Sequence, residues 1–328
     1  MNGQDVMVSS RVRLARNYTD LPFDLSRRPG DAERCIQRTQ NALELSGLGE
    51  GFHLFRLREM QAAQRQALNE KHLITRDLLK RQDTAAVLLN EQMNVSVMIN
   101  EEDHLRIMSV RPGRQLLQGE ADCFRVEEAL SGQAAFAFDA QLGYLTAYPI
   151  NTGTGLRASM VLHLPLLTAD KQMGAMNQMA AKVGLTIRGL YGEGSEALGS
   201  LYLISNSAAL GRTEHELVSA VDMVALQLGQ MEQKLREQHF QQQKAQTEDD
   251  IGRAWGILRN ARLLEQRGAA VVRKESECSG QTLFDLANEL LSDQARLASM
   301  RSALREIAVP DATDRICDIL EELSHTPA

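Results

Sequence analysis

One stretch of this sequence constrains the fold more than any other. Residues 84–99 (Thr-Ala-Ala-Val-Leu-Leu-Asn-Glu-Gln-Met-Asn-Val-Ser-Val-Met-Ile) predict two apolar β-strands around a turn at Asn90, Glu91 and Gln92. Strands joined by so short a connection pair antiparallel. The second strand ends directly before residues 100–104, where charged side chains gather. The sequence therefore predicts an antiparallel sheet with a polar site at the end of one strand.

Other segments predict helices around this sheet. Residues 6–10 indicate a strand, residues 136–138 and 143–146 indicate short pieces of the same sheet, and residues 185–190 and 199–206 indicate a hairpin. Helical periodicity is found at residues 31–47, 58–82, 158–167, 169–183, 213–247, 281–292, 294–307 and 311–324. The predicted fold class is α+β, an antiparallel sheet flanked by helices, followed by a helical C-terminal region.

A chain of 328 residues can form one sizeable domain with an appendage. The glutamine-rich stretch 238–246 is polar all round and indicates a solvated extension or linker. We therefore expect a main domain at 1–237, mostly helical up to about residue 82, and a mostly helical region at 238–328.

Composition excludes several classes of function. A net charge of −7 disfavours a bulk binder of nucleic acid or of anionic membranes. The four cysteines, Cys35, Cys123, Cys278 and Cys317, have neither disulfide nor metal-site spacing, which is typical of reduced thiols in the cytosol. The sequence contains neither a signal peptide nor an apolar run long enough to span a membrane. We expect a cytoplasmic protein that provides no metal site of its own.

Two glutamates and five arginines carry the candidate chemistry. Glu102 lies in Asn-Glu-Glu-Asp-His at 100–104, and Glu193 lies in Tyr-Gly-Glu-Gly-Ser-Glu at 191–196. The arginines are Arg11, Arg13, Arg106, Arg157 and Arg188, whereas Arg16 is predicted to be an ordinary surface residue. Arginine forks bind phosphate oxygens, and carboxylates bind a guanidinium in the same bidentate way. A site with both can hold ATP on one side and an arginine side chain on the other.

These motifs resemble the ATP:guanido phosphotransferases, or phosphagen kinases, whose catalytic domain has a glutamine-synthetase-like fold. The resemblance implies that Glu102 and Glu193 are catalytic, with Glu101, Asp103 and His104 in support. It implies that the cofactor is ATP with Mg²⁺, the metal being held mainly by phosphates and waters. The implied nucleotide-binding residues are Arg11, Arg13, Arg106, Arg157, Arg188, Ser9, Ser10 and His72. There is no P-loop motif.

Within the family, residues 5–262 most resemble the bacterial protein-arginine kinases of the McsB group. Residues 70–74, 191–199 and 253–262 carry this likeness. Only eight residues precede Ser9, where small-guanidino kinases have a helical domain, and the group itself begins further upstream, so a short N-terminus is expected.

The resemblance implies phosphorylation of arginine side chains in proteins, giving N-phosphoarginine and ADP. The implied partners are proteins with exposed arginines, the stress repressor CtsR, an McsA-type activator, Clp protease components and a second copy of the chain. The implied role is to mark proteins for Clp degradation and to regulate the stress response.

Two departures from the family pattern leave alternatives open. Tyr148 stands where the family has a cysteine before the Gly153-Thr154-Gly155 loop, and a phenol does not ordinarily replace the charge of a thiolate. Residues 263–328 instead resemble the tail of MurG-type glycosyltransferases, although a diverged helical tail is the simpler interpretation, and no glycosyltransferase activity is predicted. The alternatives are a kinase of free arginine or another small guanidino compound, and a nucleotide- or phosphoarginine-binding regulator with little turnover. The short N-terminus argues against the first, and both glutamates argue against the second.

Overall fold

The computed structural model describes residues 4–23, 28–190, 197–273, 278 and 280–307. The chain divides into two compact units, Met1–Gln238 and His239–Ala328, and each is described by itself. Within the described residues, none of the helices is long and apolar enough to cross a membrane.

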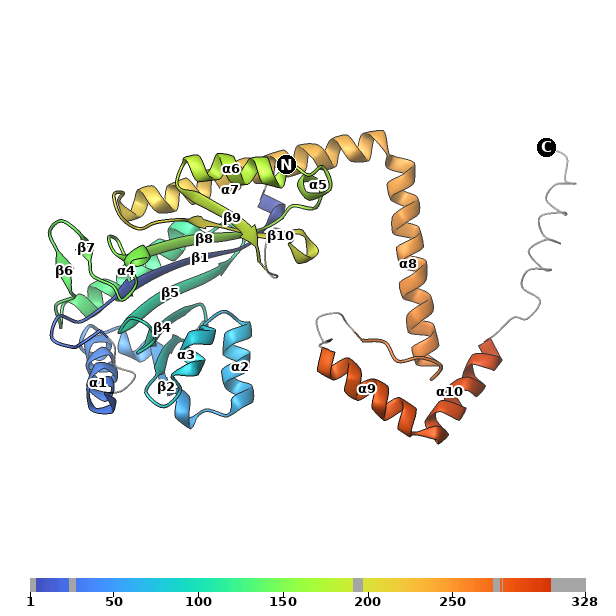
Figure 1. The fold of residues 1–328 in the computed structure, drawn as a ribbon, viewed down its shortest axis with the longest axis horizontal. Coiled ribbons are helices and arrows are strands. Elements are labelled where there is room, and N and C mark those ends of the chain that lie inside the picture. Colours follow the sequence, from blue (N-terminus) through green and yellow to red (C-terminus); the bar gives the residue numbers. More distant parts are fainter. Residues whose placement is uncertain (1–3, 24–27, 191–196, 274–277, 279, 308–328) are drawn as a thin grey trace, which may run out of the picture. The chain divides into compact units, whose positions relative to one another are not determined.

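The first unit is built on an eight-stranded sheet in which every neighbouring pair is antiparallel (Figure 1). The strand order is β2-β3-β4-β5-β1-β8-β10-β9, so β1 lies near the centre. The strands are β1 (Met7–Arg16), β2 (Phe52–Arg56), β3 (Ala86–Asn90), β4 (Val95–Ile99), β5 (Leu105–Pro112), β8 (Leu156–His163), β9 (Leu185–Gly189) and β10 (Leu201–Asn206). The predicted fold class is confirmed, and so is the hairpin at 84–99, which forms β3 and β4.

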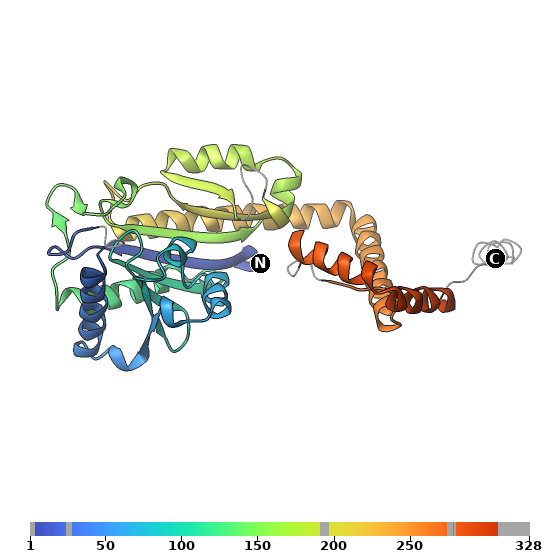
Figure 2. The ribbon, with the colours of Figure 1, turned by 60° about the horizontal axis from the view of Figure 1, so that its bottom comes forward.

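The two faces of the sheet differ. On one face, alternate strand residues such as Val12 and Leu14 form the main core with α1 (Pro29–Leu45), α4 (Leu116–Ser131), α6 (Met173–Lys182) and α7 (Glu214–Gln242). Both ribbon views show the long α7 running along the sheet (Figures 1 and 2). On the other face, α2 (Ala62–Glu70) and α3 (Arg76–Lys80) cover only the β2–β5 half, through a smaller apolar cluster. The other half of that face, formed by β1, β8, β10 and β9, carries polar side chains such as those of Arg13 and Arg157.

Several predicted elements were wrong. Residues 158–167 form strand β8 and the short helix α5 (Pro165–Ala169), because the run Ala-Ser-Met-Val-Leu is buried between β1 and β10 rather than along one helical stripe. The short strands β6 (Phe138–Asp139) and β7 (Gly143–Tyr144) form a separate two-stranded sheet. The part up to residue 82 contains the helices α1, α2 and α3 together with β1 and β2, and β2 was not predicted.

The second unit contains helices. The stretch 213–247 divides into α7 and α8 (Lys244–Gln266). Helices α9 (Gly280–Ser292) and α10 (Gln294–Ile307) agree with the predicted spans 281–292 and 294–307. The predicted helix at 311–324 lies outside the described residues.

The sequence predicts Arg16 to be a surface residue, but in the structure it is fully buried. Its Nε donates to Glu127 Oε1 on α4 at 2.6 Å, and its Nη1 donates to the carbonyls of Ala15 and Thr154. Its guanidinium carbon lies 3.5 Å from the centre of the Tyr144 ring. Arg16 therefore ties the glycine-rich loop 153–155 to the end of β1. Burial of a charge is tolerated because its partners satisfy most of its donors.

We expect Gly155→Ala to destabilise the first unit. Gly155 has a φ of +63°, and an added Cβ would lie 2.5 Å from Arg16 Nη1 and 2.6 Å from the Ala15 carbonyl oxygen. Strain and clash together should lower the free energy of unfolding by about 2 kcal/mol or more. The control is Gly174→Ala in α6, where a Cβ meets no atom within 4 Å. Urea unfolding of both variants is the measurement, and an equal effect would contradict the role given to the loop.

Candidate functional site

The five predicted arginines all lie on the face of the sheet that α2 and α3 cover only in part. Arg13 on β1 pairs with Arg157 on β8, and residues directly opposite on antiparallel strands share a face. Arg11 lies two residues before Arg13 and therefore points the same way. Arg106 on β5 pairs with Ala15, two residues after Arg13, and Arg188 on β9 joins the face through Leu203 and Val161. The sheet thus brings together residues that are far apart in the sequence.

These guanidinium groups repel one another. Burial, together with the charges of Arg106, Arg157 and Arg11, lowers the pKa of Arg13 to about 9. Burial and neighbouring arginines also lower the pKa of Arg11 and of Arg157. Among the described residues, no carboxylate forms an ion pair with Arg11, Arg13 or Arg157; Arg11 and Arg157 instead contact the hydroxyls of two serines, Ser159 at 3.4 Å and Ser205 at 3.3 Å. A polyanion is the ligand that such a cluster favours.

The other predicted nucleotide residues divide into two groups. Ser9, Arg11 and His72 line one small pocket with Ser159. Burial and the charge of Arg11 lower the pKa of His72, so its ring is neutral near pH 7. Ser10 faces the opposite side of the sheet: its hydroxyl donates to the Gly113 carbonyl at 2.6 Å and accepts from the Gln115 amide. The structure therefore does not bring the Ser10 side chain together with the arginines.

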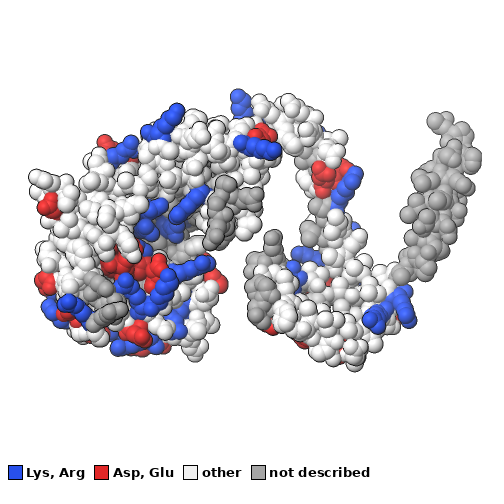
Figure 3. Space-filling model, viewed as in Figure 1, with Lys and Arg blue, Asp and Glu red and all other residues white. Residues whose placement is uncertain are grey.

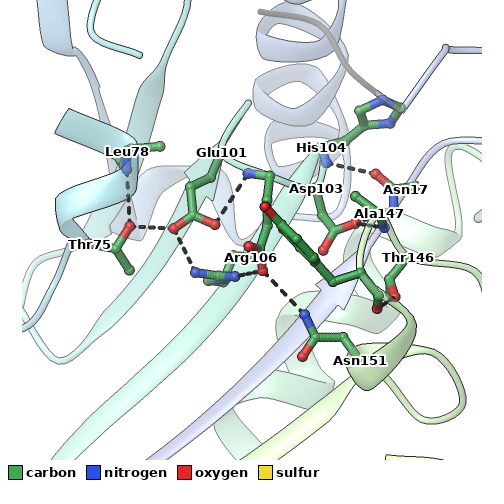
Figure 4. A network of polar contacts seen from close by, with 12 residues as sticks. Asn17, Thr75, Leu78, Glu101, Asp103, His104, Arg106, Thr146, Ala147 and Asn151 are labelled. Atoms are coloured by element: carbon green, nitrogen blue, oxygen red, sulfur yellow. Dashed lines mark hydrogen bonds and ion pairs between the residues drawn. The ribbon is translucent and has the colours of Figure 1, made fainter. Parts of the chain in front are cut away.

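The acidic motif begins where β4 ends (Figure 4). Glu102 Oε1 accepts a hydrogen bond from Arg106 Nη2 and another from the Asn151 side-chain amide at 3.2 Å. The Glu102 side chain is 19% exposed, so solvent and a ligand can reach it. Burial raises the pKa of Glu102, Arg106 opposes this shift, and Glu101 and Asp103 add to it. A carboxylate with a raised pKa is a better proton acceptor than a fully solvated one.

The neighbours of Glu102 are buried and hold the motif in place. Glu101 accepts from Arg106 Nη1 at 2.6 Å and from the hydroxyl of Thr75, the residue that caps α3. Asp103 accepts from the Asn17 side chain and from the Ala147 amide, each at 2.7 Å. The contacts of Glu101 and Asp103 therefore hold the backbone of Glu102, which lies between them, in place.

His104 has a structural role as a neutral ring. Its Nδ1 accepts from the Tyr18 amide at 2.9 Å, so its Nε2 donates to the Pro22 carbonyl at 2.8 Å. Burial lowers the pKa of His104, which agrees with this tautomer. His104 therefore holds the chain after β1 against the acidic motif.

Glu193, the second predicted catalytic carboxylate, lies in 191–196, outside the described residues. Sequence reasoning missed Thr75 and Asn151, which contact Glu101 and Glu102. Asn151 lies three residues after Tyr148, which stands where the family has a cysteine, and this proximity was the available signal. Figure 3 shows basic and acidic side chains meeting in a hollow on one face of the first unit.

Across the part of the chain that the structure describes, no group of three or more histidine, cysteine, aspartate or glutamate side chains could hold a metal ion. Mg²⁺ often keeps waters and is bound through substrate phosphates, so the arginine cluster fits a nucleotide–magnesium complex without a protein cage.

Comparison with known proteins identifies the class. Residues 34–235 match the model of the ATP:guanido phosphotransferase C-terminal catalytic domain, and this chain belongs to that family. It is 41% identical over 313 residues to the protein-arginine kinase of Symbiobacterium thermophilum, covering 92% of this chain and 88% of that protein. It is 39% identical over 269 residues to the protein-arginine kinase of Bacillus subtilis (strain 168), covering 81% and 74%.

Solved structures give the same fold. A lombricine kinase matches with a TM-score of 0.63 at 27% identity, over 72% of this chain and 70% of that chain. The duplicated taurocyamine kinase of Schistosoma mansoni, solved with transition-state-analogue components, matches with a TM-score of 0.60 at 29% identity, over 72% and 34%. The family implies the use of ATP.

We expect Arg157→Ala to weaken ADP binding by about tenfold or more, because a charge-assisted fork to phosphate oxygens is lost. Arg157→Lys should restore only part of the affinity, since an ammonium group cannot bind bidentately. The control is Arg58→Ala, a half-exposed arginine that pairs with Glu59 at 3.6 Å. Calorimetric titration is the measurement. Equal affinity in wild type and Arg157→Ala would place the phosphates elsewhere.

Proposed function

We propose that this chain is a protein-arginine kinase, which transfers the γ-phosphoryl group of ATP to an arginine side chain in a protein and gives N-phosphoarginine and ADP. One observation carries the proposal: the row of arginines ends at Arg106, whose guanidinium also binds Glu102. A surface for phosphates and a carboxylate that binds a guanidinium therefore adjoin. The names of the relatives at about 40% identity agree with this substrate.

Arg11, Arg13, Arg106, Arg157 and Arg188 are proposed to bind the phosphates, with Ser9 and His72 beside them. Their mutual repulsion supports this role, because a bound polyphosphate would relieve it. The Ser10 hydroxyl, bonded to residues 113 and 115, instead supports the start of α4. Mg²⁺, when bound, would supply charge neutralisation on the phosphates.

Glu102 is proposed to orient the substrate guanidinium and to accept its proton. A nitrogen of the guanidinium attacks the γ-phosphorus, a nitrogen–phosphorus bond forms, and the bond from phosphorus to the ADP oxygen breaks. The nitrogen loses a proton to Glu102, since a protonated guanidinium is a poor nucleophile. Glu193 is proposed as the second carboxylate on resemblance alone.

The wider role is proposed from the resemblance as well. Proteins with exposed arginines would be the substrates, with CtsR, an McsA-type activator and Clp protease components as partners, and the chain would act in the cytoplasm as a homodimer. The likeness of the tail to MurG-type glycosyltransferases stays a prediction. The alignment with the Symbiobacterium thermophilum kinase extends into residues after 263, which favours the simpler interpretation, a diverged kinase tail.

The proposal is tested by incubation with ATP, Mg²⁺ and either an unfolded protein or free arginine. Mass spectrometry under neutral conditions should find acid-labile phosphate on arginine residues of the protein and little phosphoarginine from the free amino acid. The reverse preference would favour a small-guanidino kinase, an alternative supported by the likeness to lombricine and taurocyamine kinases. ADP binding without either product would indicate a regulator.

Glu102→Gln should lower kcat by roughly 10²-fold or more, because the amide keeps the shape but cannot accept the proton. ADP affinity should change little. Glu91→Gln, in the exposed turn between β3 and β4, is the matched control and should keep wild-type turnover. Turnover of Glu102→Gln close to that of the control would remove Glu102 from the mechanism.

The pH dependence of kcat should show the raised pKa of Glu102. The base works only when ionised, so turnover should fall as the pH drops through this pKa, which lies above the ordinary 4.5. Withdrawal of Arg106 to phosphate would raise the pKa further, because Arg106 favours the charged form. The residual activity of Glu102→Gln should lose this acidic limb. An identical limb in both proteins would assign it to another group.

A further inference from the structure

The segment 146–152 is held rigidly against the acidic motif. The Ala147 amide donates to Asp103 at 2.7 Å, and Asn151 donates to Glu102 at 3.2 Å (Figure 4). Between these anchors, the Tyr148 carbonyl accepts from the Thr146 hydroxyl at 2.8 Å and from the Asn151 amide at 3.0 Å. The backbone of Tyr148 is therefore fixed relative to two consecutive carboxylates.

The side chain of Tyr148 does not share this burial. It is 54% exposed, and Ile150 in the same turn is 57% exposed, whereas Asn151 is buried. A single exposed aromatic residue needs no explanation on an ordinary surface. This one stands on a pinned backbone three residues from the side chain that binds Glu102.

The same chain shows how a tyrosine and a glutamate bind one guanidinium together. Glu127 accepts from the edge of the Arg16 guanidinium at 2.6 Å, and the Tyr144 ring covers its face at 3.5 Å. The two contacts do not compete, since a carboxylate bonds in the plane of the group and a ring stacks on its face. A glutamate and a tyrosine also occur at the proposed acceptor site, where Tyr148 lies three residues before the Asn151 that binds Glu102.

We propose that the Tyr148 ring covers one face of the guanidinium of the target arginine while Glu102 binds its edge. This inference rests on the proposed function and adds to it a residue that selects a planar cation. Tyr148 contributes the quadrupole of its ring rather than a negative charge, so its hydroxyl is dispensable. The contact acts on the bound cation and weakens once the guanidinium loses its proton. Tyr148 should therefore determine KM for arginine more than kcat.

The experiment compares Tyr148→Phe, which keeps the ring, with Tyr148→Leu, which keeps apolar bulk alone. Binding of a peptide with a single arginine is measured by calorimetry in the presence of ADP, and KM and kcat are measured with the same peptide. Tyr148→Leu should weaken peptide binding and raise KM roughly three- to thirtyfold, the range of a cation–π contact, and Tyr148→Phe should stay within about twofold of wild type. Phe240→Leu, which changes an exposed aromatic residue of the second unit, is the control and should have no effect.

The outcomes separate this inference from the proposed function. Equal peptide affinity in Tyr148→Leu and wild type would overturn the ring contact even if the wild type is an active kinase. A loss of the same size in Tyr148→Phe and Tyr148→Leu would assign the effect to the hydroxyl and also overturn it. Peptide binding that depends on the ring, in a wild type without turnover, would support the contact and refute the kinase. Equal ADP affinity and thermal unfolding midpoints in all variants confirm that only the peptide site changed.

Discussion

The candidate site of this protein depends on one constraint: a face of the sheet holds arginines side by side although they repel one another. Isolated on the surface, these side chains would turn apart into water. Here β1, β5, β8 and β9 fix their backbones, and burial together with the neighbouring arginines lowers the pKa of Arg13 to about 9. The well-packed core on the opposite face offsets that cost. Strain of this kind is typical of sites that become stable when their ligand binds.

Arg106 connects the cationic face to the acidic motif. It adjoins Arg13 across β1 and β5, and both Glu101 and Glu102 bind its guanidinium. Two guanidinium groups thus compete for Glu102 in the proposed reaction, namely Arg106 and the substrate. Phosphates that draw Arg106 toward themselves would leave Glu102 free for the incoming arginine. Arg16, which pairs with Glu127 and lies against the Tyr144 ring, shows elsewhere in the fold how a carboxylate and a ring bind one guanidinium.

Sequence reasoning succeeded where a local pattern decides the structure. The apolar runs around Asn90 could form only a hairpin, and it is observed as β3 and β4. The local pattern is misleading where packing decides: the sequence of β8 predicts a helix, because its apolar residues do not alternate when both faces of the strand are buried. Arg16 was placed at the surface because its partner Glu127 lies 111 residues away in the sequence. Ser10 was grouped with Ser9 although neighbouring strand residues point to opposite faces.

The proposed reaction requires that the arginine-bearing face binds the nucleotide phosphates and that Glu102 faces the acceptor guanidinium. The most direct test is a crystal structure with ADP, Mg²⁺, nitrate and an arginine peptide. Nitrate replaces the planar phosphoryl group of the transition state. We expect the peptide arginine on Glu102 and, around the ADP phosphates and nitrate, the guanidinium groups of Arg11, Arg13, Arg106, Arg157 and Arg188. An ADP bound elsewhere, such as in the pocket between the β6–β7 hairpin and the start of α7, would contradict it.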